Sequence, residues 1–195
     1  MKFYLFAFVV LAFPAMLFAG GGTEAYDQQA QSYQGSTHVV IPYGVTVIDR
    51  DSGLRNKALS IVTIPSSVVQ IGSEAFSDNV LTGISIPDSV ISIGDRAFYN
   101  NRLTSVFIGK NVTSIGDGAF RGNRLPSVTI PDSVISIGEF AFGDNNLRSI
   151  SIGANVRLGY SALSYSANSA YTKNDSRAGT YTTSDGNNWS YSPRR

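Results

Sequence analysis

Apolar residues recur along this chain with a period of 22 residues. The segment IPDSVISIG occupies positions 86–94 and again 130–138, and IGKNVTSIG at 108–116 keeps the same apolar positions midway between them. From Leu59 the chain aligns with itself without a gap, which gives four regular 22-residue repeats over 59–146. This pattern predicts a stack of similar units, because one such unit is too small to bury its own apolar face.

Each repeat favours two short strands over a helix. Pro or Gly follows the first apolar segment and Gly follows the second, and in a helix these residues would cost about 1 to 3 kcal/mol each. In the repeat over 103–124, side-chain alternation predicts that Val106 points inward and Phe107 outward. Asp117 is expected to cap a short helical turn that carries Phe120 into the interior.

The segments on either side are irregular copies of the repeat. The one from His38 has one extra residue before Leu59, and the one from Leu147 lacks a residue between Val156 and Leu158. End units of a stack are expected to differ, because each must cover an apolar face that an inner unit buries against a neighbour. We therefore predict a repeat domain over 37–170.

The chain begins with the pattern of a secretory signal peptide. Lys2 precedes a run of about 16 apolar residues, and small residues follow. Residues 1–19 are expected to direct export, either as a cleaved signal or as an uncleaved anchor. Residues 20–36 contain Gly, Gln and Ser without an apolar period, which indicates a linker or lead-in segment.

Composition removes several classes of function. The chain has no cysteine, so it can form no disulfide and offers no thiolate to a metal. Without Lys2, 14 basic residues balance 14 acidic ones, and a neutral surface does not favour nucleic acid or an anionic membrane.

Catalytic and metal-binding patterns are also weak. His38 is the only histidine and there is no G-x-S-x-G segment, so the sequence does not indicate a hydrolytic triad. Asp49-x-Asp51 followed by Gly53 has too few acids for a calcium loop. We expect a protein that is not an enzyme and that uses no metal or cofactor.

The consensus of the repeat is L-x-x-V/I-x-I-P/G-x-S/N-V-x-x-I-G-x-x-A-F-x-x-N. It resembles the leucine-rich repeats of the bacterial surface-antigen class, of the treponemal type found in exported proteins of spirochaetes and oral anaerobes. The resemblance covers about residues 37–170. The unit here is one residue shorter than is usual in that family, and Asn stands where the family often has Cys.

The resemblance implies an α/β-type solenoid, a right-handed leucine-rich-repeat superhelix of mostly short β-strands with short helical turns. It also implies a C-terminal β-hairpin cap within 171–195, with strands at 179–183 and 189–191 around Asp185-Gly186. Six aromatic residues crowd this end of the chain, and we expect them to cover the open last coil. They are Tyr160, Tyr165, Tyr171, Tyr181, Trp189 and Tyr191.

One asparagine per repeat is expected to form a column once the coils stack. A buried amide can accept a hydrogen bond from one backbone N–H and donate to a carbonyl of the neighbouring coil. We therefore expect a structural role for this column, and little part in ligand recognition. Its members are Asn79, Asn101, Asn123 and Asn145.

The outward positions of the first strands form the candidate binding surface. Most carry small or hydroxyl side chains, whereas Phe107 and Ile61 are large and apolar, and such side chains can anchor a partner when exposed. The alternative is that the tail or the lead-in segment folds over them. The candidate partner-binding residues are Ile61, Thr63, Ser85, Ser105, Phe107, Ser127, Thr129, Ser149 and Ser151.

The resemblance implies an exported binding protein, because several relatives are described as adhesins for host matrix or bacterial partners. The expected location is the cell surface or the medium, and the expected partner is a host matrix or bacterial surface protein. A periplasmic module that binds glycan or peptide, or that acts as a scaffold, is the alternative. Nucleic acid is not expected as a partner, and a membrane only through an uncleaved signal.

Overall fold

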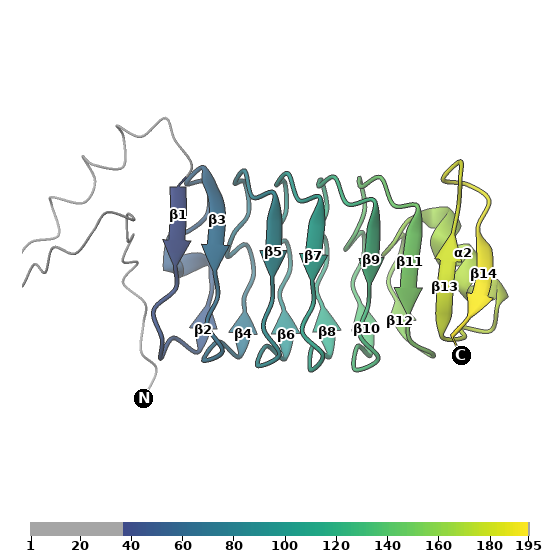
Figure 1. Cartoon of the computed structure of the whole chain (residues 1–195), viewed down its shortest axis with the longest axis horizontal. Helices are drawn as coiled ribbons and strands as arrows, with labels where there is room; N and C mark the ends of the chain where they lie inside the picture. The colour runs from purple at the N-terminus through teal and green to yellow at the C-terminus, as the bar shows by residue number, and fades with distance from the viewer. Residues whose placement is uncertain (1–36, 195) are drawn as a thin grey trace, which may run out of the picture.

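The chain winds into a solenoid whose coils lie side by side along one axis (Figure 1). The computed structural model describes residues 37–194. The expected signal peptide (1–19) and the lead-in segment (20–36) lie outside the described residues. Six coils form the stack, since the sheet on its second side has six strands. Neighbouring coils pair in parallel, which confirms the solenoid of short strands expected from the 22-residue period.

Each coil places one strand on each of two sides. The strands of the first side are β1 (Thr37–Val40), β3 (Leu59–Thr63), β5 (Gly83–Ser85), β7 (Ser105–Phe107), β9 (Ser127–Thr129) and β11 (Ser149–Ile152). The strands of the second side are β2 (Val47–Ile48), β4 (Gln70–Ile71), β6 (Ser92–Ile93), β8 (Ser114–Ile115), β10 (Ser136–Ile137) and β12 (Arg157–Leu158). In the regular repeats, partners such as Ile93 and Ile115 are one period apart.

The irregular end coils absorb their length differences outside the regular strands. Ile48 pairs with Ile71, 23 positions further on, and the extra residue of the first coil falls in the 3-10 turn η1 (Arg50–Ser52) that follows. At the other end Ser136 pairs with Arg157, 21 positions further on, so the missing residue falls at the bend before β12. The inward register of the apolar side chains is therefore preserved in both end coils.

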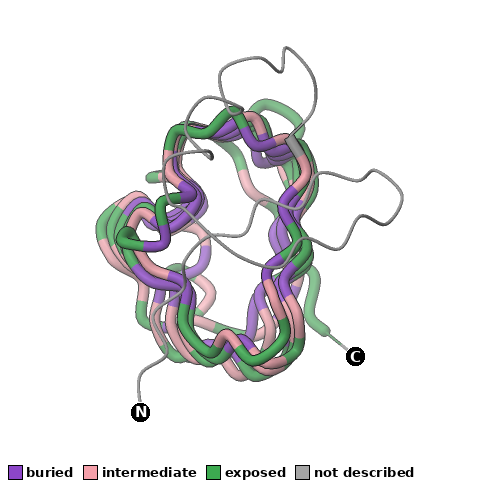
Figure 2. Tube along the Cα trace, turned by 90° about the vertical axis from the view of Figure 1, so that its left-hand side faces the viewer, coloured by how far each residue is buried: buried purple, intermediate pink, exposed green. Residues whose placement is uncertain are grey.

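A column of phenylalanines fills the interior. Phe76, Phe98, Phe120 and Phe142 come from four consecutive coils, and their rings stack with centroids 5.1 to 5.3 Å apart. All four side chains are buried, and the end-on view of Figure 2 shows buried residues recurring at the same places around the cross-section. The stack shares one core along its length, because each ring packs on the ring of a neighbouring coil, and Phe98 and Phe120 do so on both sides.

The corner after each second strand is a series of turns. The N–H of Arg96 donates to the carbonyl of Asp117 in the next coil, and that of Phe98 to the carbonyl of Ala119. Because these N–H groups bond between coils, they cannot make the bonds of a helix to residue i−4. The expectation that Asp117 caps a helical turn is wrong, since its carboxylate accepts the N–H of Glu139 in the next coil at 2.7 Å.

A helix and a hairpin close the last coil. The helix α2 (Tyr165–Lys173) begins after Ser164, whose hydroxyl accepts the N–H of Ala167. The predicted hairpin is confirmed: β13 (Gly179–Thr182) pairs antiparallel with β11, and β14 (Ser190–Pro193) pairs antiparallel with β13. The sequence did not predict α2, because its residues YSANSAYTK show no apolar stripe.

Two buried tyrosines join this cap to the solenoid. The hydroxyl of Tyr171 donates to the carbonyl of Gly153 at 2.7 Å and accepts the N–H of Val156 at 3.0 Å. The ring of Tyr181 packs edge-on against that of Tyr171, with centroids 5.7 Å apart. Burial raises the pKa of Tyr181 to about 12.

The other four aromatic residues of this end divide into two pairs. Trp189 and Tyr191 are partly buried and pack against the core, as expected of a cover for the last coil. Tyr160 and Tyr165 are exposed, so the expectation that they help to cover this coil is wrong. Tyr160 precedes α2 and Tyr165 is its first residue, whereas the buried positions of this helix are Ala167 and Tyr171.

Candidate functional site

Two columns of outward side chains run along the first side of the solenoid, where the strands lie next to one another (Figure 1). Strand pairing and the repeat period place each residue beside its counterpart in the next coil, about 4.8 Å away. The first column is His38, Ile61, Gly83, Ser105, Ser127, Ser149, Thr182 and Ser190. The second column is Val40, Thr63, Ser85, Phe107, Thr129, Ser151, Thr180 and Ser192. We call the two columns together the sheet face.

All nine residues that the sequence named as candidate partner contacts lie in the sheet face. Phe107 is 60% exposed and Ile61 is 50% exposed. Neither the hairpin nor α2 covers them, because both elements lie beyond β11 at the end of the stack (Figure 1). The C-terminal tail reaches the face only at this end, where Arg194 donates to the hydroxyl of Ser151 and pairs with Asp132.

The side chains that surround Phe107 on the sheet face are small. Its neighbours in the column are Ser85 and Thr129, and the position diagonal to it in β5 is Gly83, which has no side chain. An aromatic ring between such small neighbours stands above the floor of the sheet, where a partner can enclose it on several sides. This is the geometry in which a single aromatic side chain contributes most to an interface.

The sheet face carries no formal charge along the described strands, since neither column contains Asp, Glu, Lys or Arg. Its large apolar side chains, Val40, Ile61 and Phe107, lie in β1, β3 and β7, whereas β9, β11, β13 and β14 present hydroxyl groups. Apart from Arg194, which reaches Ser151 at the C-terminal end, charges begin at the border of the face. There the N–H of Lys110 donates to the carboxylate of Asp88 at 2.9 Å, which lowers the pKa of Asp88.

The asparagine column lies at the corner that precedes the first strands. The Oδ1 of Asn101 accepts the N–H of Leu81 in the previous coil, and its Nδ2 donates to the carbonyls of Phe76 and Phe98. Asn79, Asn123 and Asn145 repeat this arrangement in their own coils. Each phenylalanine carbonyl of the inner coils thus accepts from two asparagines, one of its own coil and one of the next. These amides are occupied by backbone groups.

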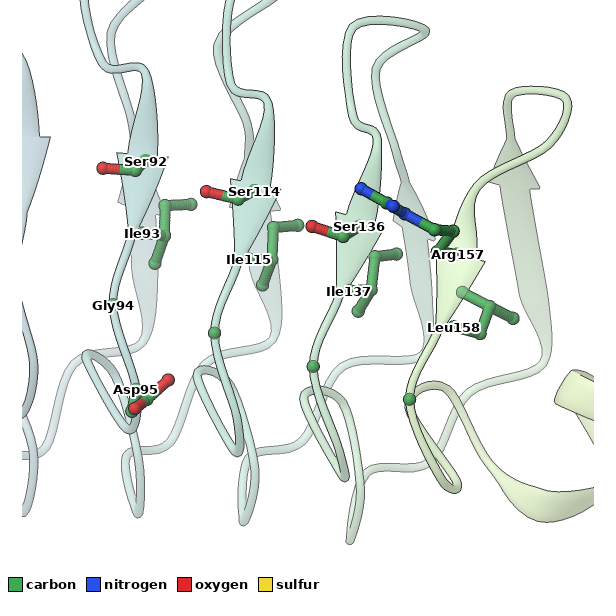
Figure 3. A pocket seen from close by; sticks show the side chains of 13 residues that line it. Ser92, Ile93, Gly94, Asp95, Ser114, Ile115, Ser136, Ile137, Arg157 and Leu158 are labelled. Carbon is green, nitrogen blue, oxygen red and sulfur yellow. The ribbon is translucent and has the colours of Figure 1, made fainter.

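A second exposed surface, which sequence reasoning missed, runs along the second side. Val69, Ile91 and Ile135 are between 43% and 54% exposed and occupy the same position in their coils. Beside them lies a shallow depression of about 480 Å³, into which Ser92, Ser114 and Ser136 project from neighbouring strands (Figure 3). The available signal was the apolar residue between the two inward positions of V-x-x-I.

The residues considered for catalysis or metal binding have local partners. His38 forms a side-chain hydrogen bond with Thr63 at 3.1 Å. The side chain of Asp49 caps η1 by accepting the N–H of Asp51, and Gly53 ends the turn at a φ of 69°. Among residues 37–194, no group of three or more His, Cys, Asp or Glu side chains is placed to hold a metal ion. Within the same range, no helix has the length and apolar character needed to cross a membrane.

A stack of parallel coils with leucine at each start, asparagine at one corner and an open sheet face defines a leucine-rich-repeat solenoid. The model of the BspA type leucine-rich repeat region matches residues 48–170, in six copies. The chain therefore belongs to the BspA-type leucine-rich-repeat family. A comparison with curated protein sequences gives no match.

Three solved structures resemble this one. A leucine-rich repeat protein from Bacteroides ovatus is 26% identical with a TM-score of 0.53, over 66% of this chain and 40% of that protein. A leucine-rich cell surface protein from Faecalibacterium prausnitzii is 20% identical with a TM-score of 0.38, over 66% of this chain and 62% of the other. The pneumococcal vaccine antigen PcpA is 19% identical with a TM-score of 0.41, over 69% and 44%. The chain thus matches between 40% and 62% of the length of these proteins.

Proposed function

We propose that this protein is exported and binds another protein with its sheet face, in adhesion or in another interaction at the bacterial surface. Phe107 is the central anchor and Ile61 the second anchor, and the hydroxyl groups of Thr63, Ser85 and Thr129 complete the contact. Membership of the BspA-type family supports a binding role over catalysis. The treponemal subtype is part of this proposal, and the C-terminal hairpin supports it.

The observation that carries the proposal is the exposure of Phe107 on an uncharged, otherwise low surface. Most large apolar side chains within residues 37–194 are buried in the core, and leaving such a group in water forgoes about 1.5 to 3 kcal/mol. Hydrogen-bonding side chains around an aromatic anchor allow a partner to pair its polar groups instead of burying them unsatisfied. The fold does not require phenylalanine at position 107, because serine occupies the equivalent positions 85 and 151 in strands of the same kind.

The binding test uses immobilised protein and a panel of purified host matrix proteins, bacterial surface proteins and cell-wall glycan. For a protein that binds, the double variant Phe107→Ser, Ile61→Ser is expected to lose about 2 to 4 kcal/mol of binding free energy, or roughly 30- to 700-fold in affinity. Its circular dichroism spectrum should be unchanged, because both side chains are already largely exposed.

The matched control is the double variant Ile91→Ser, Ile135→Ser. It removes two apolar side chains of similar exposure from the second side of the solenoid. Full binding by the control and weak binding by the sheet-face variant would support the proposal. Equal binding by parent and sheet-face variant would remove the sheet face as the binding site, and binding of glycan alone would favour the glycan-binding alternative.

Export and surface display are tested separately. The apolar run in residues 1–19 supports export, and protease treatment of intact cells distinguishes the outer layers of the envelope. Surface display predicts cleavage of this protein in intact cells. Protection until the outer membrane is opened would place it in the periplasm and would contradict an adhesive role.

A further inference from the structure

The departures from the repeat pattern concentrate in the middle of the solenoid. Phe107 stands where the two coils on either side have hydroxyl residues, and the turn after it is Gly109-Lys110-Asn111 where the neighbouring repeats have Pro-Asp-Ser. At the corner before the first strand, Arg102 and Arg124 stand where the adjoining coils have neutral residues, Val80 and Asn146. Arg102, Phe107 and Arg124 are exposed, so these three altered side chains are free to contact a partner.

Arg102 and Arg124 form an exposed pair of like charges. They occupy the same position in consecutive coils, because the N–H of Arg102 donates to the carbonyl of Leu81 and that of Arg124 to the carbonyl of Leu103. Consecutive coils are about 4.8 Å apart. Within residues 37–194, neither arginine makes an ion pair. Side chains of like charge on neighbouring coils repel each other, and an anionic group bound between them would relieve that repulsion.

The pair lines a groove of about 970 Å³ that runs across the coils beside the asparagine column. The two acidic residues of the groove are already engaged: Asp78 pairs with Arg55 at 3.1 Å, and Asp144 with Arg121 at 2.7 Å. At the position of Asp78 and Asp144, the two intermediate coils have Asn100 and Gly122, so neither of them adds a negative charge to the row. Arg102 and Arg124 therefore give the groove a positive charge that its acidic residues do not balance.

We propose that this groove binds an acidic segment of the partner protein, the same partner that docks on the sheet face. The inference rests on the proposed function of that face, which it extends by giving the partner a chemical character. Residues 102 and 107 are separated by five positions, or at most about 17 Å along the chain. A protein interface of ordinary size covers about 800 Å² on each partner, so one footprint includes both Phe107 and the arginine pair. The guanidinium groups hold carboxylates in the bidentate geometry that suits them.

Binding to the groove can be measured without the partner, by the fluorescence anisotropy of labelled hexaglutamate mixed with the protein at low salt. We expect hexaglutamate to bind the parent protein with an affinity that falls steeply as salt is added, and hexaglutamine not to bind. The variant Arg102→Gln, Arg124→Gln is expected to bind at least about tenfold more weakly. The variant Phe107→Ser, Ile61→Ser should bind hexaglutamate as the parent does, so failure of the groove and failure of the sheet face are told apart.

The matched control is Arg96→Gln, Arg157→Gln, which removes the same charge from two exposed arginines elsewhere on the solenoid. Equal loss of binding in this control would show a general charge effect and overturn the inference, as would full binding by Arg102→Gln, Arg124→Gln. Binding of polygalacturonate without binding of hexaglutamate would assign the groove to an acidic glycan and also overturn it. Once a protein that binds the sheet face is found, the variant Arg102→Gln, Arg124→Gln must bind it more weakly than the parent does. An unchanged affinity would refute the inference that this partner also contacts the groove.

Discussion

The asparagine column provides the sharpest test of how the coils are held together. In Asn101→Ala the amide is lost, and the buried N–H of Leu81 has no remaining acceptor at that corner. The carbonyls of Phe76 and Phe98 lose one donor each but keep another, from Asn79 and Asn123. One orphaned N–H costs about 1 to 3 kcal/mol, and the lost bonds to the carbonyls add to it, so we expect a loss of about 2 to 4 kcal/mol in the free energy of unfolding.

Asn101→Asp separates hydrogen bonding from the mere presence of a side chain. Ionised aspartate still accepts the N–H of Leu81, but it turns an oxygen toward the carbonyls of Phe76 and Phe98, where an amide donates. The folded state disfavours this charge, which raises the pKa of the new carboxyl group above that of an unfolded aspartate. The stability of this variant is therefore expected to improve as pH falls through that raised pKa, because the neutral acid can donate.

Urea unfolding followed by circular dichroism measures both effects. The matched control is Asn146→Ala, at the exposed position that follows the column member Asn145, and it should change stability by less than about 0.5 kcal/mol. If Asn101→Ala were no worse than this control, the asparagine column would not hold the corners, and hydrogen bonding by its amides could not explain why the coils stay stacked. A pH-independent Asn101→Asp variant would likewise contradict the assigned donor roles.

Two further predictions concern the core and the cap. Phe120 stacks between Phe98 and Phe142, so Phe120→Ala is expected to lower the free energy of unfolding in urea by about 3 to 5 kcal/mol. Phe120→Leu should lower it by less than about 2 kcal/mol. Equal losses in the two variants would contradict the packing role of the ring. The pKa of Tyr181 is higher in the folded protein than in an unfolded chain, so the stability linked to its neutral form is complete below about pH 10 and is lost as pH rises toward 12. Thermal unfolding across this range should show a steeper decline for the parent than for Tyr181→Phe, and parallel declines would contradict the assignment.

The repeating part of the fold could be predicted because each structural demand recurs in every unit. A strand position such as Ile115 must be apolar in each coil, and Gly116 must remain glycine, since a side chain there would collide with the carboxylate and backbone of Asp95. Repetition of one pattern in four units makes such demands visible in a single sequence. The same reasoning identified the outward column that contains Phe107.

Features made by one segment only could not be predicted in this way. The helix α2 depends on Ser164 as its cap and on the burial of Tyr171 against the last coil, and neither signal is repeated elsewhere. The role given to Asp117 was wrong for a related reason. From sequence, a carboxylate after a glycine is compatible with a helix cap, and only the position of the next coil shows that it accepts the N–H of Glu139.

The amino-acid sequence by itself determined the period, the inward and outward positions and the parallel stacking of this protein, because burial of apolar side chains permits one register only. The tertiary structure decided which groups meet between coils, such as the asparagine bonds and the engaged acids near Arg102 and Arg124. It also decided that the hairpin lies at the end of the stack and leaves Phe107 exposed. These contacts join residues about one period or more apart, and their geometry depends on how closely the coils approach, which no local pattern specifies.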